Sequence, residues 1–242
     1  MSHRPLEIGN AGKPSCGANE LGSILVVIPA MNEEFTVGVV VENVRSVWGV
    51  DVVVIDDASS DNTAKVAREA GAIVVPLMFN LGPWGAMQAG FRYALRKGYD
   101  IVVTMDGDGQ HPVEHIFDLV KPISERRADV TIGSYLPRLS VMRRIAGRFF
   151  RNLSRLPIRD FTSGFRAYHR KVLPCLVCSE MCLLDYQDLG ALLLLYHKGF
   201  KVLEVPVYME FRKFGKSRVF YSWREVFRYL VHTSILGLAR RR

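Results

Sequence analysis

Residues 101–112 read Ile-Val-Val-Thr-Met-Asp-Gly-Asp-Gly-Gln-His-Pro, an apolar run that ends in two carboxylates. The five residues Ile101–Met105 are apolar or β-branched, which predicts a short buried strand. Asp106 and Asp108 are each followed by a glycine, which marks the end of a strand and lets another molecule approach the backbone. Because the aspartates are two residues apart, extended backbone would project both carboxylates to the same side.

Two carboxylates with the amide oxygen of Gln110 nearby suit a hard divalent cation that keeps its other positions for water and phosphate oxygens. The spacing excludes a calcium loop. Counted from Asp106, the position that needs glycine is His111, and the twelfth position, which needs glutamate, is Phe117. Taken alone, the motif is also compatible with a solvated turn, because Asp and Gly are common in turns.

Strands and helices alternate on both sides of this stretch. Ser23–Pro29 is a continuous apolar run, typical of a parallel strand that is buried on both faces. We expect further strands at 51–55, 72–76, 101–105 and 129–133. We expect one helix that ends near Val47 and three more at 64–70, 85–97 and 113–126. This alternation predicts an α/β fold with a mainly parallel sheet.

Polar clusters follow the carboxyl ends of four of these strands: Asn32/Glu33, Asp56/Asp57, Asn80–Gly85 and Asp106–Gln110. In open α/β sheets ligands bind outside this edge, so the clusters predict a shared site. The chain has neither a Gly-x-Gly-x-x-Gly loop after its first strand nor a Gly-Lys-Ser/Thr phosphate loop. Hydride transfer and P-loop hydrolysis are therefore disfavoured.

The composition of the chain limits the classes of binding partner and the cellular compartment that we expect for the protein. The 242 residues carry 32 Lys+Arg against 24 Asp+Glu, a net charge of +8, which favours nucleotides, lipid phosphates or an acidic membrane face. Nucleic acid is disfavoured, because the basic residues are not interleaved with aromatics. Cys175, Cys178 and Cys182 have helical spacing without a fourth ligand, so we expect buried free thiols in a reduced, cytosolic chain. Residues 1–20 predict a disordered leader, and no window is long enough to span a bilayer.

Five segments in a fixed order carry a family resemblance. They are Ile28–Glu33, Val54–Thr63, Asp106–Pro112, Asp160–Arg166, and Glu204–Val207 followed by Arg212-x-x-Gly215-x-Ser217. Together they resemble the family 2 glycosyltransferases of GT-A fold, most of all the dolichyl-phosphate mannosyltransferase and polyprenyl-phosphate glycosyltransferase branch. The resemblance covers about residues 23–218, so we expect a GT-A domain at 21–218 and an amphipathic C-terminal helix at 219–242.

The resemblance implies a role for each matched position. A metal-dependent, inverting enzyme would move a hexose from GDP-mannose or a UDP-hexose to a polyprenyl or dolichyl phosphate. The nucleotide-sugar would contact Pro29, Ala30, Asn32, Glu33, Asp56, Asp57, Gly85, Asp106 and Gly107. Mg²⁺ or Mn²⁺ would be held by Asp106, Asp108 and Gln110, and Arg212 would hold the pyrophosphate or lipid phosphate. The chain departs from the family pattern at three places. Met31 replaces a common aromatic residue, Tyr135 stands where many relatives have Arg, and the last motif ends Gly215-Lys216-Ser217-Arg218 rather than Gly-x-Ser-Lys.

Two acceptor classes remain open. A lipid phosphate needs cations and no base, and the stretch 138–159 offers seven arginines without an acid, which suits an amphipathic helix at a membrane. We assign acceptor binding to Arg138, Arg143, Arg144, Arg148 and Ser163. A solvated face of a core helix is the alternative for this stretch. A saccharide hydroxyl needs a base, and Asp185 or Asp188 lies roughly where relatives acting on sugars carry one. Those two acids are also explained as carboxylates at a helix start.

The remaining expectations concern the membrane and three ring side chains. Residues 220–242 have helical apolar spacing and end in three arginines, so the helix either lies on the membrane or packs on the domain. We expect the protein on the cytosolic face of a membrane, bound to the surface or to a membrane-spanning partner. His111 is expected to be a hydrogen-bonding residue near the metal rather than a ligand, and Trp84 and Phe79 to belong to the core or a pocket wall.

Overall fold

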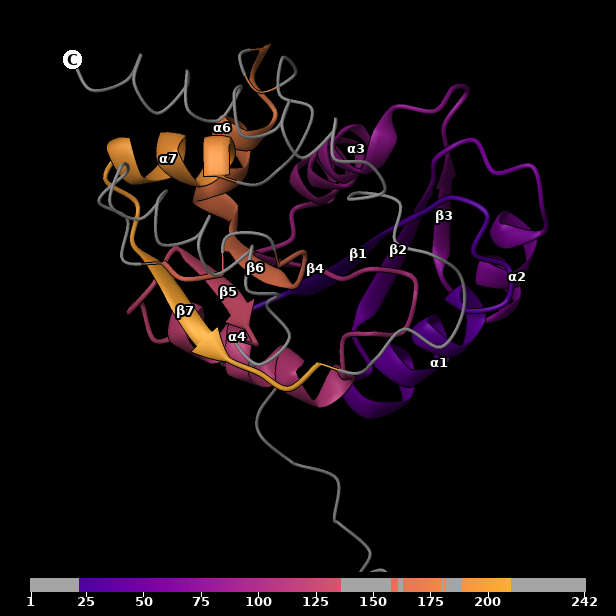
Figure 1. Ribbon diagram of the computed structural model, residues 1–242, viewed down its shortest axis with the longest axis horizontal. Helices are drawn as coiled ribbons and strands as arrows, with labels where there is room; N and C mark the ends of the chain where they lie inside the picture. The colour runs from indigo at the N-terminus through magenta and orange to yellow at the C-terminus, as the bar shows by residue number, and fades with distance from the viewer. Residues whose placement is uncertain (1–21, 136–157, 161–162, 180, 182–188, 210–242) are drawn as a thin grey trace, which may run out of the picture.

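The computed structural model describes residues 22–135, 158–160, 163–179, 181 and 189–209 (Figure 1). The first part of the chain alternates strands and helices: β1 (Ile24–Ala30), α1 (Val37–Trp48), β2 (Asp51–Asp56), α2 (Thr63–Glu69), β3 (Ile73–Pro76), α3 (Gly82–Lys97) and β4 (Ile101–Thr104). The 3₁₀ turn η1 (Val113–His115), α4 (Ile116–Ser124) and β5 (Val130–Ser134) follow. The later elements are β6 (Arg166–His169), η3 (Arg170–Val172), α6 (Leu173–Leu176), α7 (Leu189–His197) and β7 (Val202–Pro206).

Seven strands form one sheet in the order β3-β2-β1-β4-β6-β5-β7. Among the described strands only β6 is antiparallel to its neighbours, β4 and β5. The predicted mainly parallel α/β sheet is confirmed. Strand β6 was not predicted, because Arg166-Ala-Tyr-His is a short segment without the apolar run that marks the other buried strands.

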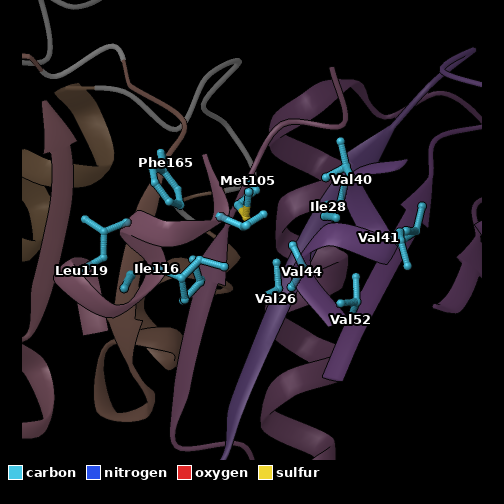
Figure 2. Close-up of a cluster of buried hydrophobic side chains, with 14 of the residues drawn as sticks. Val26, Ile28, Val40, Val41, Val44, Val52, Met105, Ile116, Leu119 and Phe165 are labelled. Atoms are coloured by element: carbon cyan, nitrogen blue, oxygen red, sulfur yellow. The ribbon is translucent and has the colours of Figure 1, made fainter. Parts of the chain in front are cut away.

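The two faces of β1 explain its unbroken apolar sequence. Val26 and Ile28 pack on one face with side chains from α1, η1 and α4, the cluster shown in Figure 2. Leu25 and Val27 pack on the other face with side chains from α3, α6 and α7. Because successive side chains of a strand alternate between faces, a strand covered on both sides is apolar at every position.

Helix α3 lies directly against β1 at Gly90. A Cβ atom at Gly90 would be 2.3 Å from Cγ1 of the buried Val27, closer than real carbon atoms approach. The helix also begins at Gly82, earlier than the predicted Gly85, and has a proline in its first turn, a favoured position for proline.

Two local predictions were wrong in detail. The expected helix 113–126 begins as the 3₁₀ turn η1 and ends at Ser124. Cys175 and Cys178 do not share a helix face, because α6 ends at Leu176, and both are free but half-buried rather than buried thiols. Cys16 and Cys182 lie outside the described residues, as do the leader and the C-terminal helix. No helix in the described ranges has the length and apolarity needed to cross a bilayer.

Candidate active site

The strands that carry the predicted polar clusters end at one edge of the sheet. Ala30, at the end of β1, is in register with Asp56, at the end of β2. Val27 of β1 is in register with Thr104, the last residue of β4, and Thr104 is also in register with Arg166, the first residue of β6. Because β6 is antiparallel, its amino end lies at the carboxyl edge of the parallel strands. The carboxyl ends of β1, β2 and β4 and the amino end of β6 therefore lie at this edge.

The loops after β1 and β2 are bonded to each other. The Asn32 N–H donates to Ser59 Oγ (2.9 Å), and the Ser60 N–H donates back to Asn32 Oδ1 (2.8 Å). The Glu33 N–H donates to Thr63 Oγ1 (2.8 Å) at the start of α2. Both loops also hold a residue with left-handed φ, Asn32 (51°) and Ala58 (58°), a conformation that costs an alanine energy and is typical of functional loops.

Asp57 connects the end of β2 to the start of α3. Its N–H donates to Ala30 O (2.8 Å), and its Oδ1 accepts the Leu81 N–H (2.7 Å). Burial raises the pKa of the Asp57 carboxyl above its usual value. The N–H groups of Leu81 and Gly82 oppose this shift, and the charge of Asp56 adds to it. The carboxylate thus caps the first N–H groups of α3, a contact that sequence reasoning missed.

Asp56 and Glu33 belong to the same pair of loops. Asp56 is buried, and its Oδ1 accepts the Ser59 N–H (3.1 Å). Glu33 is half-buried, and its Oε2 accepts the Thr36 hydroxyl (3.1 Å). The predicted contacts of these two acids with the nucleotide-sugar stay predictions.

The loop before α3 reaches back to the first motif. Asn80 Nδ2 donates to Met31 Sδ (2.7 Å), and Asn80 Oδ1 accepts the Gly82 N–H (3.0 Å). Gly85 permits close packing at the start of α3, since a Cβ there would be 2.5 Å from Leu81 Cβ. Of the two alternatives for Phe79, the core is wrong, because the residue is 71% exposed in this loop, and the pocket wall stays a prediction.

Trp84, by contrast, is confirmed as a core residue. Its ring is buried, and its Nε1–H donates to Met181 O (2.9 Å).

Asp106 and Asp108 lie in the turn that follows β4. The strand ends at Thr104 and the chain turns at 107–108, so the premise of extended backbone between the two aspartates was wrong. Gly107 is buried, and a Cβ there would be 3.4 Å from Ile28 Cγ2 and 3.8 Å from Ala30 Cβ. These are ordinary contact distances, so the turn lies against the end of β1, beside Pro29 and Ala30. Asp108 Oδ1 accepts the Gln110 N–H (3.1 Å) within the turn.

The segment that leads into β6 covers Asp106. A Cβ on Gly164 would be 3.0 Å from Asp106 Oδ1 and 3.3 Å from Oδ2. Gly164 is held there because its carbonyl accepts the Thr104 hydroxyl (2.7 Å). Ser163, predicted to bind the acceptor, is buried, and its Oγ accepts the Phe165 N–H (3.3 Å). The proximity of Gly164 to Asp106 was not predicted, because it depends on the antiparallel entry of β6.

The residues present fit a divalent cation. Asp106 and Asp108 are half-exposed carboxylates, and the missing side chain of Gly164 leaves space beside the Asp106 oxygens. Gln110 is buried, and its role as a third ligand stays a prediction. In the part of the chain that the structure describes, no cluster of three or more His, Cys, Asp or Glu residues is arranged to hold a metal. A cation here would thus complete its shell with water or ligand oxygens, as Mg²⁺ usually does.

The last motif adjoins the fourth. Glu204 Oε1 accepts the Asp160 N–H (2.6 Å) and also the N–H of Arg159. Tyr135 packs edge-to-face on Tyr208, with ring centroids 5.3 Å apart. The described parts of the five motifs therefore lie along one sheet edge. Seven further predicted residues lie outside the described ranges: Arg138, Arg143, Arg144, Arg148, Asp185, Asp188 and Arg212.

Comparisons with known proteins agree with this arrangement. Residues 25–177 match the family model described as Glycosyl transferase family 2. The polyprenol monophosphomannose synthase of Mycolicibacterium smegmatis is 31% identical over 86% of this chain and 85% of its own. The undecaprenyl-phosphate mannosyltransferase of Micrococcus luteus is 30% identical over 90% of this chain and 95% of its own.

A solved structure shows the same fold. Glucosyl-3-phosphoglycerate synthase from Mycobacterium tuberculosis, solved with Mn²⁺, UDP and phosphoglyceric acid, superposes with a TM-score of 0.68 at 20% identity, covering 90% of this chain and 78% of its own. The predicted GT-A type of α/β fold is thereby confirmed. The chain is a glycosyltransferase, and it belongs to glycosyl transferase family 2.

Proposed function

We propose that this enzyme transfers a hexose from a nucleotide-sugar to a polyprenyl phosphate, with a divalent cation held by Asp106 and Asp108. The observation that carries the proposal is the assembly of five motifs at one sheet edge, with Gly164 leaving space beside the Asp106 carboxylate. The two relatives at 30% and 31% identity are named for polyprenol and undecaprenyl phosphate chemistry, which supports the acceptor class.

The bond changes of the reaction define what the site must do. A phosphate oxygen of the acceptor forms a bond to the anomeric carbon while the bond from that carbon to the diphosphate breaks, and the electron pair leaves with the diphosphate. Attack from the face opposite the leaving group inverts the anomeric centre. When bound, a divalent cation neutralises the charge that builds on the diphosphate.

The chain's own residues supply binding and orientation. The loops after β1 and β2 are tied together at Asn32 and Ser59, and we assign them to the nucleotide. Asp106 and Asp108 would hold the cation after the end of β4, in the turn that lies beside Ala30. A phosphate monoester has a second pKa of about 6, so the acceptor is largely anionic at neutral pH and needs no general base.

The test is a panel of GDP- and UDP-sugars with Mn²⁺, scored for release of nucleoside diphosphate with and without a short-chain polyprenyl phosphate. Asp108→Ala should reduce lipid-stimulated release by roughly 100-fold or more, since a fixed cation contributes several kcal/mol. Asp118→Ala, which removes an exposed carboxylate bonded to His115 (2.8 Å), serves as the control and should act like the wild type.

Asp188→Ala separates the two acceptor classes. Transfer to a lipid phosphate should survive this change, because no base is required. Loss of turnover in Asp188→Ala, together with activity on a saccharide and none on the lipid phosphate, would contradict the proposal and favour a hydroxyl acceptor.

A further inference from the structure

The backbone N–H of Asp106 donates its hydrogen bond to a side chain rather than to a neighbouring strand. The Met105 N–H still donates to Val27 O (3.1 Å), which continues the β1–β4 ladder past Thr104. The next N–H, that of Asp106, donates to Nδ1 of His111 (3.1 Å). Backbone N–H groups that leave a ladder near the core need an acceptor, and here His111 provides it at the proposed cation ligand.

His111 is itself held rigidly. It is 6% exposed, and its ring stacks on Phe165 with a centroid distance of 4.9 Å and an interplanar angle of 10°. Phe165 is fully buried and directly follows Gly164, which lies against the Asp106 carboxylate. The segment leading into β6 thus contacts both the carboxylate and the histidine that holds its backbone.

The hydrogen bond also defines the tautomer of a neutral ring. Because Nδ1 accepts the Asp106 N–H, the ring proton is on Nε2. Nε2 lies 3.7 Å from Asp106 Oδ2, too far for a hydrogen bond but close enough for attraction between the N–H dipole and the carboxylate. Both ring nitrogens therefore face the same residue, one its backbone and the other its side chain.

We infer that His111 is a positioning residue for the cation: it holds Asp106 in the orientation that binds the metal without touching the metal itself. The inference rests on the proposed function, because it takes Asp106 as a cation ligand. Groups that orient metal ligands change metal affinity by about 10- to 100-fold when they are removed.

Three substitutions at His111 separate the effect of its ring nitrogens from the effect of its stacking on Phe165. His111→Phe keeps a flat ring for stacking on Phe165 and removes both nitrogens. His111→Asn keeps an acceptor close to the position of Nδ1, and His111→Gln is polar but does not place an acceptor there. His169→Phe is the matched control, because His169 Nδ1 accepts the Lys171 N–H (3.1 Å) in the same way at the opposite end of β6.

The measurement is Mn²⁺ affinity, read from the electron paramagnetic resonance signal of free Mn²⁺ at saturating UDP or GDP. His111→Phe and His111→Gln should weaken Mn²⁺ binding about 10-fold or more, and His111→Asn should stay within about 3-fold of the wild type. His169→Phe should match the wild type. Nucleoside diphosphate affinity in EDTA, which a general disturbance of the fold would lower, should be unchanged in every variant.

The outcomes distinguish a failure of the inference about His111 from a failure of the proposed function. Wild-type Mn²⁺ affinity in His111→Phe overturns the inference about His111. Should that variant fail to fold, wild-type affinity in His111→Gln overturns it instead. If the wild-type protein binds no Mn²⁺, or if Asp106→Asn binds it equally well, the proposed function itself is wrong.

Discussion

At the scale of single residues, Gly164 lies directly beside the proposed cation ligand Asp106. Its backbone φ lies outside the left-handed region, so an alanine meets no backbone strain there. The added Cβ would instead be 3.0 Å from Asp106 Oδ1, tighter than most real contacts, and would enter the space beside the carboxylate. Glycine is therefore favoured at position 164 by the nearby Asp106 carboxylate and not by the backbone conformation.

Gly164→Ala should weaken Mn²⁺ binding about 10-fold, because the Asp106 carboxylate must move to admit the new methyl group. The unfolding midpoint in metal-free buffer should change little, since no buried core contact is lost. Mn²⁺ titration and thermal melting of the same preparation measure the two quantities. A normal melting point with unchanged Mn²⁺ affinity would argue against the space beside Asp106 being a cation site.

Residue-level prediction succeeded where the chemistry of a side chain restricts its use. His111 was predicted to be a hydrogen-bonding residue near the metal, and its bond to the Asp106 N–H confirms the bonding role. The capping role of Asp57 was not predicted, because its partner Leu81 is 24 residues away and carries no recognisable signal. Phe79 does not belong to the core, because an aromatic residue in a loop can be exposed as well as buried.

At the scale of elements, the packing of α3 on β1 depends on Gly90. The nearest atom to a new Cβ, at 2.3 Å, belongs to Val27, a buried and β-branched residue with little freedom to rotate. An alanine would therefore push the helix away from the strand that carries the first motif.

Gly90→Ala should lower the free energy of unfolding by about 1–3 kcal/mol, the usual effect of overpacking a core. Urea denaturation followed by circular dichroism measures this value. Arg96→Ala, an exposed change on the same helix, should stay within about 0.5 kcal/mol of the wild type. Equal stability of Gly90→Ala and wild type would mean that α3 is free to shift along β1.

Strands β1, β2 and β4 could be predicted because each has an apolar run that is buried in the sheet. Strand β6 was missed, because its first residue is a fully buried arginine whose Nε donates to Ser163 O (2.8 Å). Charge at that position argues against a central strand, and only the surrounding fold supplies the compensating partners.

At the scale of the whole molecule, the two halves of the proposed site come from different parts of the chain. The loops assigned to the nucleotide follow β1 and β2, whereas the surroundings of Asp106 also include Gly164 and Phe165. The order of the motifs in the sequence predicted one shared edge, and contacts such as Asp106 with Gly164 required the antiparallel strand.

Binding at this composite site should stabilise the folded protein. Mn²⁺ together with a nucleoside diphosphate, each near 100 times its dissociation constant, should add at least about 2.7 kcal/mol, more than Mn²⁺ alone. Thermal shift assays measure the effect. Asp108→Ala should lose the Mn²⁺-dependent part, and an undiminished Mn²⁺ shift in that variant would place the cation elsewhere.

The reversed strand β6 has a consequence for biosynthesis. During translation, β1 to β4 are synthesised one after another. Most of the strands among them that are adjacent in the sheet are also consecutive in the sequence. Position 164 emerges later and inserts its strand between two that were made before it. Domains are generally synthesised and folded from the amino end, so a nascent chain arrested before β6 would display Asp106 without its cover. The surroundings of the proposed cation site are therefore complete only after β6 has joined the sheet.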